Sequence, residues 1–339
     1  MNPMRHFRAR PQKSGKVYYY FDKGGKPRTE IPLGSDYVLA VRKWSELMAK
    51  DAPATITNFE ELAKRYERDE ITQKAKSTQA TQTGDLKKLR AFFTNGKDSA
   101  PLEAITPKHI RALLDRNKTT PTTANRLKRL FSHMFNMARE WGYTEKENPV
   151  RGVEGFELDK REVYVTDEVF QAVREQGAAP LQDAMDLAYL TGQRPGDVLT
   201  MTDRHVVNGM LEVQQGKTKT KRRIVVEGEL AVVLTRITER KKAYKVWSPN
   251  LAVNTRGLPM TKQTLRKAFE AARKDAAKAN PALAASIKEM WFYDLRAKAA
   301  DDVSDDRNDQ AAADLLGHQN VATTKKHYLR KGKIVRPTR

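Results

Sequence analysis

The stretch near the C-terminus that decides the fold of the surrounding chain reads Leu315-Leu316-Gly317-His318-Gln319-Asn320-Val321-Ala322-Thr323-Thr324-Lys325-Lys326-His327-Tyr328-Leu329. Gly317 predicts the end of one helix, and Asn320 is a favourable N-cap for the next. His318 is therefore expected in the corner between two helices, with Tyr328 about two turns further along. Taken alone, the stretch also fits a structural hairpin in which Tyr328 packs in the core and His318 lies in a surface turn. A metal site is disfavoured, because His318 and His327 fall on opposite faces of a helix.

Three upstream stretches favour a catalytic interpretation. They are Thr191-Gly192-Gln193-Arg194-Pro195-Gly196-Asp197-Val198-Leu199, Gln214-Gln215-Gly216-Lys217-Thr218-Lys219-Thr220 and Tyr293-Asp294-Leu295-Arg296. In this order, with the tyrosine last, they resemble the catalytic signature of the tyrosine recombinases, the phage-integrase family. The family pattern is an arginine after a Thr-Gly turn, a lysine on a β-hairpin, an H-x-x-R box, an L-G-H box and a nucleophilic tyrosine. All five parts occur here, with Tyr293 where the family usually has histidine.

The resemblance implies catalytic roles for Arg194, Lys217, Tyr293, Arg296, His318 and Tyr328. A tyrosine hydroxyl has a pKa near 10, so an active one lacks about 4 kcal/mol of ionisation free energy at neutral pH and needs help with its proton. Two guanidinium groups suit a phosphodiester whose negative charge grows in the transition state. A 5′-hydroxyl leaving group needs a proton donor, for which Lys217 is the best candidate. His318 fits as a hydrogen-bond donor to phosphate or as a proton-transfer partner of Tyr328.

Other residues of these stretches are expected to support the site. Asp197 would brace the arginines or His318, and Asp294 would act as a structural cap or brace. Tyr293 can donate a hydrogen bond to phosphate but cannot carry a proton near neutral pH. It is also a second candidate nucleophile, although its position beside Arg296 argues against that role. Basic residues at the predicted β-turn are expected to contact DNA phosphates, and they are Lys219, Lys221 and Arg222.

Composition points to a polyanionic partner. The chain has 339 residues and a formal net charge of +21, which suggests two or three domains and binding to nucleic acid. An anionic membrane surface is the second candidate, but no apolar run approaches the roughly 20 residues that span a bilayer. The absence of cysteine excludes disulfides and thiolate metal sites and fits a reducing cytoplasm. The resemblance implies the cytoplasm of a bacterial host cell, where the protein would be nucleoid-associated. We expect no metal and no cofactor, because in this family the covalent link stores the phosphodiester's energy.

Residues 1–52 predict a small module. Strands are expected near 16–21 and 28–33, joined by a turn, with a helix from about 36 to 50 whose apolar stripe comprises Val38, Val41, Trp44, Leu47 and Met48. One helix on a two- or three-stranded sheet leaves the other sheet face free. Integrases that bind accessory arm sites carry a module of similar layout, so the resemblance implies DNA contact here. The expected contact residues are Arg5, Arg8, Arg10, Lys23, Lys26 and Arg28.

The remaining chain predicts two further domains. Residues 55–148 indicate four helices, the first capped by Thr57, and the resemblance implies a helical, SAM-like core-binding domain. Residues 149–162 read as an interdomain linker, and residues 163–339 as the catalytic domain. The predicted fold class is therefore mainly α with small β-sheets (α+β). The basic residues after Tyr328 are expected to dock on a neighbouring protomer or on DNA.

The sequence thus predicts a site-specific recombinase that cleaves and rejoins double-stranded DNA. The resemblance implies a 3′-phosphotyrosyl intermediate, a Holliday junction and a homotetramer. Two alternatives stay open: a type IB topoisomerase-like strand transferase, and a non-catalytic DNA-binding regulator on a recombinase scaffold. A host DNA-bending protein and an excision factor stay open as further partners.

Overall fold

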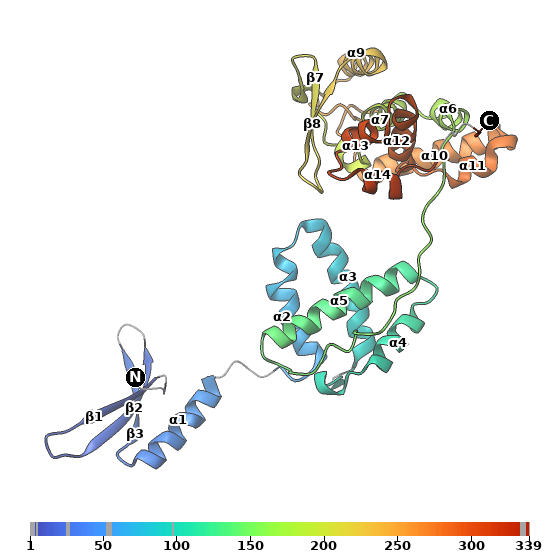
Figure 1. The fold of residues 1–339 in the computed structure, drawn as a ribbon. Coiled ribbons are helices and arrows are strands. Elements are labelled where there is room, and N and C mark those ends of the chain that lie inside the picture. The colour runs from blue at the N-terminus through green and yellow to red at the C-terminus, as the bar shows by residue number, and fades with distance from the viewer. Residues whose placement is uncertain are drawn as a thin grey trace. The chain divides into compact units, whose positions relative to one another are not determined.

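The computed structural model describes residues 4, 6–24, 28–51, 56–96, 98–332 and 337–338 (Figure 1). The chain divides into two units, residues 1–158 and residues 159–339. Helices predominate, and the strands of the described ranges form three small antiparallel sheets. The predicted fold class, mainly α with small β-sheets, is therefore confirmed. No helix in the described part of the chain is long and apolar enough to cross a membrane.

The N-terminal module is a three-stranded sheet with one helix. Strands β1 (Phe7–Pro11), β2 (Val17–Gly24) and β3 (Thr29–Gly34) pair in that order, and α1 (Tyr37–Asp51) follows. The third strand is β1, which sequence reasoning left among the residues before the sheet. Four buried residues form the small core between sheet and helix: Phe7, Phe21, Leu33 and Ala40. Most of the expected apolar stripe of α1 packs against this core, but Val38 is 74% exposed, so the stripe was predicted too long.

Four main helices form the second part of the first unit. They are α2 (Phe59–Asp69), α3 (Lys76–Phe93), α4 (Pro107–Arg116) and α5 (Pro121–Glu140), with the short strands β4 (Thr94–Asn95) and β5 (Asp98–Ser99) after α3. Their apolar faces meet in one core, in which the rings of Phe59, Phe93 and Phe131 contact one another. Asn58, and not Thr57, caps α2, because its side chain accepts a hydrogen bond from the Glu61 amide.

The second unit contains nine α-helices, two short 3-10 helices and one sheet among its described residues. Its elements are α6 (Asp167–Glu175), α7 (Ala179–Thr191), α8 (Pro195–Val198), β6 (Val206–Val207), β7 (Met210–Gln214), β8 (Lys221–Val225), α9 (Gly228–Lys242), α10 (Lys262–Ala279), α11 (Ala284–Glu289), α12 (Asp294–Asp306), α13 (Asp309–Leu316) and α14 (Val321–His327). The predicted caps Thr166 and Asn320 are confirmed by side-chain hydrogen bonds. Helix α7 is buried over most of its length and lies against α6, α9 and α12.

Small side chains let the site-bearing helices approach closely. Helix α12 packs against both α7 and α13. Alanines at the contact, Ala297 and Ala300 on α12 and Ala312 on α13, form a small core with Leu316 and the ring of Tyr328. Because alanine adds little volume, the backbones come near one another and the tyrosine ring fills the remaining space. Tyr328 is 7% exposed. The fold thus holds this ring against the helix that carries Arg296.

Candidate active site

Arg296 is the buried centre of the site. Its side chain is fully enclosed, at 1% exposure, near the start of α12. The NH1 group donates to the Gly192 carbonyl at 2.6 Å, and NH2 donates to the Leu316 carbonyl at 2.7 Å. Burial lowers the pKa of Arg296 from its ordinary value, although a guanidinium remains charged at neutral pH. The contacts therefore fix the direction in which this cation faces.

Two helix ends meet at Arg296. Gly192 ends α7 with φ +63° and Gly317 ends α13 with φ +73°, a region that glycine enters without strain. At each glycine the chain leaves the helix in a left-handed turn. Arg194 follows Gly192 by two residues, and His318 directly follows Gly317. A Cβ atom on Gly192 would lie 3.1 Å from the Leu315 side chain, so the two turns also touch. Both predicted corner residues are thereby brought beside Arg296.

Two buried glutamines hold the loops of the site together. Gln215 donates to Gln193 Oε1 at 2.7 Å and to the Leu316 carbonyl at 2.8 Å, while its own Oε1 accepts from Arg194 NH1 at 3.1 Å. Sequence reasoning missed both glutamines. A signal was present, since burial alternates along β7 and continues to Gln215, which is an inward position occupied by a polar residue.

Asp197 links Arg194 to the β-hairpin. Its Oδ1 accepts from the Gly216 amide at 2.8 Å, and its Oδ2 lies 4.0 Å from Arg194 NH1. The buried Oδ2 has no hydrogen-bond partner among the described residues. The carboxylate thus fastens the hairpin that carries Lys217 while its free oxygen faces the arginine. The predicted bracing residue lies within reach of Arg194.

His318 lies between Arg296 and α14. Its Nε2 is 3.2 Å from Arg296 NH2, and its Nδ1 is 2.8 Å from Thr324 Oγ1. Because a guanidinium can only donate, Nε2 must accept and Nδ1 carries the proton of the neutral ring. Burial lowers the pKa of His318 to about 4, and the charges of Arg296 and Arg194 add to the effect. Thr324 was missed by sequence reasoning, although it lies four residues before Tyr328 and hence on the same helix face.

The two tyrosines of the site are hydrogen-bonded to each other. Their hydroxyl oxygens are 2.6 Å apart. Burial and the bond to Tyr328 raise the pKa of Tyr293 to about 12. Burial alone would raise the pKa of Tyr328, but the bond from Tyr293 and the charge of Arg296 outweigh it, and the pKa falls below its ordinary value. Tyr328 is therefore the hydroxyl that ionises first, and Tyr293 donates the hydrogen bond once it does.

A pocket of about 810 Å³ opens over these groups. Arg194, Lys217, Tyr293, His318 and Tyr328 all line it. Lys217 enters from the exposed turn between β7 and β8, where Lys219 adopts a left-handed conformation (φ +58°). Three other residues of the hairpin were predicted to contact DNA phosphates. Lys219 and Lys221 are exposed, whereas Arg222 donates to the Asp314 carbonyl. Five of the six predicted catalytic residues thus face one cavity, with Arg296 buried behind them.

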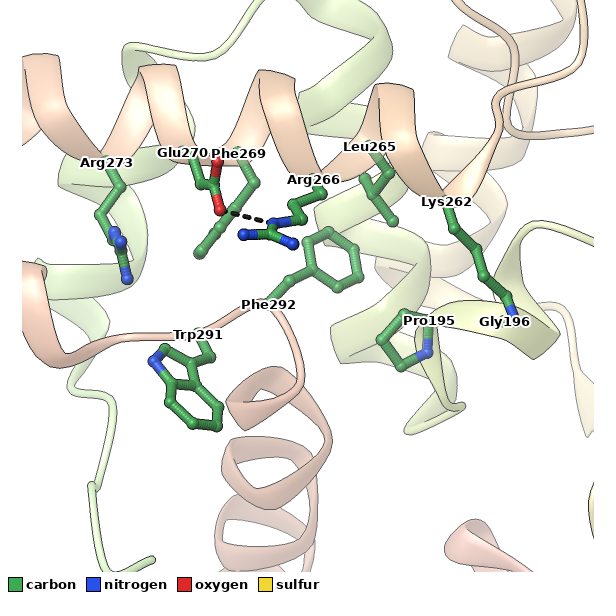
Figure 2. Close-up of a pocket in the computed structure, with 10 residues that line it drawn as sticks. All are labelled: Pro195, Gly196, Lys262, Leu265, Arg266, Phe269, Glu270, Arg273, Trp291 and Phe292. Carbon is green, nitrogen blue, oxygen red and sulfur yellow. Dashed lines mark hydrogen bonds and ion pairs between the residues drawn. The ribbon is translucent and has the colours of Figure 1, made fainter. Parts of the chain in front are cut away.

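A second pocket, of about 640 Å³, adjoins the first. It lies between α10 and the segment just before α12. Figure 2 shows the residues that line it on both segments. Pro195 and Gly196 directly follow Arg194, and Trp291 and Phe292 directly precede Tyr293. Arg266 of α10 pairs with Glu270 at 2.7 Å beside this pocket. The segments that carry the catalytic residues therefore also form its wall.

Asp294 is enclosed among cations. The side chain is fully buried and accepts from Arg161 and from Arg330, while its Oδ2 also accepts from the Trp291 amide at 2.7 Å. Arg330 and Lys331 also bind Asp301 of α12 through their backbone amides. The expectation that the residues after Tyr328 dock elsewhere is therefore wrong for these two, because α12 of the same chain holds them. Residues 333–336 and 339 lie outside the described residues.

The predicted N-terminal contacts lie on and around the free sheet face. Cross-strand pairing puts Arg8 opposite Tyr20 and Arg10 opposite Tyr18. The Arg10 guanidinium lies 5.2 Å from the centre of the Tyr20 ring and also pairs with Glu30 at 2.8 Å. Three other predicted residues are described: Arg8 and Arg28 pair with Asp22, and Lys23 is exposed. Arg5 and Lys26 lie outside the described residues.

Comparison with known proteins gives consistent matches. The model of the phage integrase family matches residues 163–333. The integrase of Enterobacteria phage 434 is 27% identical over 326 residues, and that of Escherichia phage lambda is 26% identical over 324 residues; each alignment covers 89% of this chain and 88% of the relative.

Solved structures with a similar fold include a lambda integrase dimer bound to a COC′ core site and a lambda integrase tetramer bound to a Holliday junction. Both have a TM-score of 0.70 and cover 99% of each chain, at 22% and 21% identity. The Tn1549 transposon integrase in complex with transposon right end DNA has a TM-score of 0.63 at 19% identity, covering 79% of this chain and 93% of that chain. At these identities, the likeness is one of fold.

The protonation of His318 can be measured directly. In an NMR titration of the imidazole signals, the signal that is lost in His318→Gln should stay neutral to below pH 5, with a midpoint of about 4. Arg194→Ala removes a nearby positive charge and should raise this midpoint, whereas the exposed control Arg256→Ala should leave it in place. Because the folded-state pKa lies below that of the unfolded chain, this group's contribution to stability falls as pH drops from about 6.5 towards 4. A midpoint near 6.5 in the wild type would contradict the assignment.

Proposed function

This chain belongs to the phage integrase family and is a site-specific DNA recombinase, and on that premise we propose that Tyr328 is its nucleophile. The hydroxyl attacks the scissile phosphate and forms a 3′-phosphotyrosyl bond as the bond from phosphorus to the 5′-oxygen breaks. The observation that carries the proposal is the convergence of Tyr328, Arg194, His318 and Lys217 on one pocket above the buried Arg296.

The two arginines stabilise the transition state. Negative charge grows on the non-bridging oxygens of the phosphate during attack, and fixed donors aimed at those oxygens lower the barrier. Arg194 lines the pocket and has two partners in the described chain that hold it, Gln215 and Asp197. Arg296 is pinned by two carbonyls, so its orientation does not have to be established when DNA binds. The phosphate thus meets Arg194 in the pocket, with the positive charge of Arg296 fixed behind it.

Protons move at two atoms during cleavage. The hydroxyl of Tyr328 must lose its proton, and the neutral His318 ring lies beside it, with ring centroids 4.9 Å apart; its Nε2 can take that proton once it releases the bond from Arg296. Tyr293 stabilises the developing phenolate by donating its hydrogen bond. The departing 5′-oxygen must gain a proton, and we assign that step to Lys217. Religation reverses both transfers.

Exchange of strands completes the reaction. A 5′-hydroxyl from a partner duplex attacks the phosphotyrosyl bond, restores the tyrosine and produces a Holliday junction. We propose that a homotetramer on two duplexes carries this out, in analogy to the lambda integrase tetramer that binds such a junction. In this proposal, residues 55–148 grip the core site, residues 163–339 catalyse, and residues 149–162 connect them.

The nucleophile assignment can be tested with a nicked suicide substrate that carries the crossover site. Wild type should form a covalent protein–DNA complex that survives denaturing electrophoresis, because the broken strand diffuses away and religation is blocked. Tyr328→Phe should bind the same DNA and form no complex. Formation of the complex by Tyr328→Phe, or its loss only in Tyr293→Phe, would overturn the assignment.

Tyr293→Phe should slow cleavage without abolishing it. The variant loses the hydrogen bond that lowers the pKa of Tyr328, and a bond to a charged group contributes about 1.5–3 kcal/mol, or about 10- to 100-fold in rate. The pKa of Tyr328 should rise, so the pH profile of single-turnover cleavage should move to higher pH. An unchanged profile would show that Tyr293 does not act on the nucleophile.

The N-terminal module is proposed as an arm-type DNA-binding domain comprising residues 1–52. Support comes from the outward sheet face, where arginines pair across strands with tyrosines. The Lys16 ammonium also lies 5.7 Å from the Tyr18 ring. Cations that lie over aromatic rings provide both charge for phosphates and flat surfaces for sugar and base contacts.

Replacement of Arg10 by alanine should weaken DNA binding through lost phosphate contact. In anisotropy titrations of the full chain, the slope of log K against log salt should become shallower by about one. The exposed Lys43→Ala on α1 removes the same charge from the opposite side of the module and should leave the slope unchanged. Equal slopes for both variants would argue against DNA contact at this face.

A further inference from the structure

Asp294 gathers three segments of the chain at one carboxylate. Its Oδ1 accepts from Arg161 Nε at 2.8 Å and from Arg330 NH1 at 2.7 Å. Its Oδ2 accepts from Arg161 NH2 at 2.5 Å and from the Trp291 amide at 2.7 Å. These four bonds use the acceptor capacity of a carboxylate. The partners come from the start of the second unit, the turn before α12 and the segment after Tyr328.

The contact with Arg330 lies next to the nucleophile. Arg330 follows Tyr328 by two residues, and Asp294 precedes Arg296 by two. The Arg330 side chain is only 5% exposed, and its NH1 also donates to the Val163 carbonyl at 2.8 Å. Its Nε is buried without a hydrogen-bond partner among the described residues. Among those residues, Asp294 is the carboxylate with which this nearly buried cation forms an ion pair.

The backbone of the same segment is held by a second aspartate. Asp301 lies two turns after Asp294, hence on the same face of α12. Its Oδ1 accepts from the amides of Arg330 and Lys331 at 2.9 and 3.1 Å. Tyr328 itself ends α14 through the bond from its amide to the Thr324 carbonyl. The tyrosine is therefore held from both sides, by α14 before it and by α12 after it.

Arg161 brings the entry to the catalytic unit to the same point. Its guanidinium carbon lies 3.8 Å from the centre of the Trp291 ring, and its NH2 also donates to the Glu289 carbonyl. Figure 2 shows Trp291 in the segment that leads into α12. The second unit begins at Asp159, so Arg161 is among its first residues. One carboxylate thus connects the first residues of the second unit with the segment that follows Tyr328.

We propose that Asp294 and Arg330 are positioning residues that hold Tyr328 in line with the scissile phosphate, with Arg161 completing the ion cluster. The inference rests on the proposed function, because it requires Tyr328 to be the nucleophile. Removal of the Arg330 side chain loosens the chain directly after Tyr328, which then keeps only its backbone bonds to Asp301, while Arg194, Arg296 and His318 retain their own contacts. A displacement of about 1 Å at a reacting group can reduce a rate by about 100-fold. The phosphate-binding groups should be unaffected.

The test compares two nucleophiles at one phosphate. Single-turnover covalent cleavage of the suicide substrate measures attack by Tyr328. Cleavage by added hydrogen peroxide in the Tyr328→Phe background measures the remaining groups, because the peroxide anion attacks phosphorus in place of tyrosine and the 5′-oxygen still leaves. Arg330→Met should lower the tyrosine rate by about 10- to 100-fold, with the peroxide rate and the DNA affinity within about twofold.

Two further variants separate positioning from general damage. Both bonds of the Arg330 guanidinium come from NH1, so a lysine ammonium can replace them in part, and Arg330→Lys should recover part of the rate. Lys331→Ala removes the neighbouring charge, which pairs with Asp305 on the surface, but keeps the backbone bond to Asp301; it should cleave like wild type. Asp294→Asn combined with Arg330→Met should lose less than the product of the single losses, since both act on one contact.

The outcomes separate this inference from the proposed function. If wild type forms no covalent complex, or if Tyr328→Phe still forms one, the proposed function fails first. If the complex depends on Tyr328 but Arg330→Met cleaves at the wild-type rate, the positioning inference alone is overturned. Equal losses in the tyrosine and peroxide reactions would also overturn it, because they would mean that the whole site is damaged.

Discussion

The catalytic unit depends on one buried cation that is held by two main-chain carbonyls and by the His318 ring. Arg296 donates to the carbonyls of Gly192 and Leu316, which end two different helices. A charge removed from water is costly unless its donors are satisfied, so the fold is stable only when both helix ends are in place. The residues just after those ends are Arg194 and His318. The requirement to satisfy Arg296 therefore also sets where Arg194 and His318 lie.

Polar contacts hold the loops on one side of this cation, and small residues allow close packing on the other. The amide side chains of Gln193 and Gln215 connect the loops that have no regular hydrogen bonding of their own. On the other side, Ala297, Ala300 and Ala312 allow close packing against the Tyr328 ring. The amide side chains fix how the loops are oriented, whereas the alanines determine how closely the helices approach the tyrosine ring. Together they place a tyrosine, two guanidinium groups and an imidazole within one small volume.

The sequence predicted the parts of this arrangement that have local patterns. Glycine turns, caps such as Thr166 and Asn320, and the spacing of apolar residues gave the helices of both units, and the motifs around Arg194, Arg296 and Tyr328 identified the pocket. Strand β1 was missed, because Phe7 to Pro11 is a basic stretch whose partner strand supplies most of the aromatic residues. The contact between Arg161 and Asp294 joins residues 133 positions apart. Such a pair leaves no periodic trace in the sequence.

The groups of the site are held together by contacts between segments that lie far apart in the chain. Arg194, His318 and Tyr328 converge on the buried Arg296, and the hydroxyls of Tyr328 and Tyr293 share a hydrogen bond. The bonds from Arg296 reach residues 104 and 20 positions away, at the ends of α7 and α13. The arrangement therefore forms only once α7, α12 and α13 have packed together. A fragment that lacks one of these helices would carry the motif residues without the geometry that makes them a site.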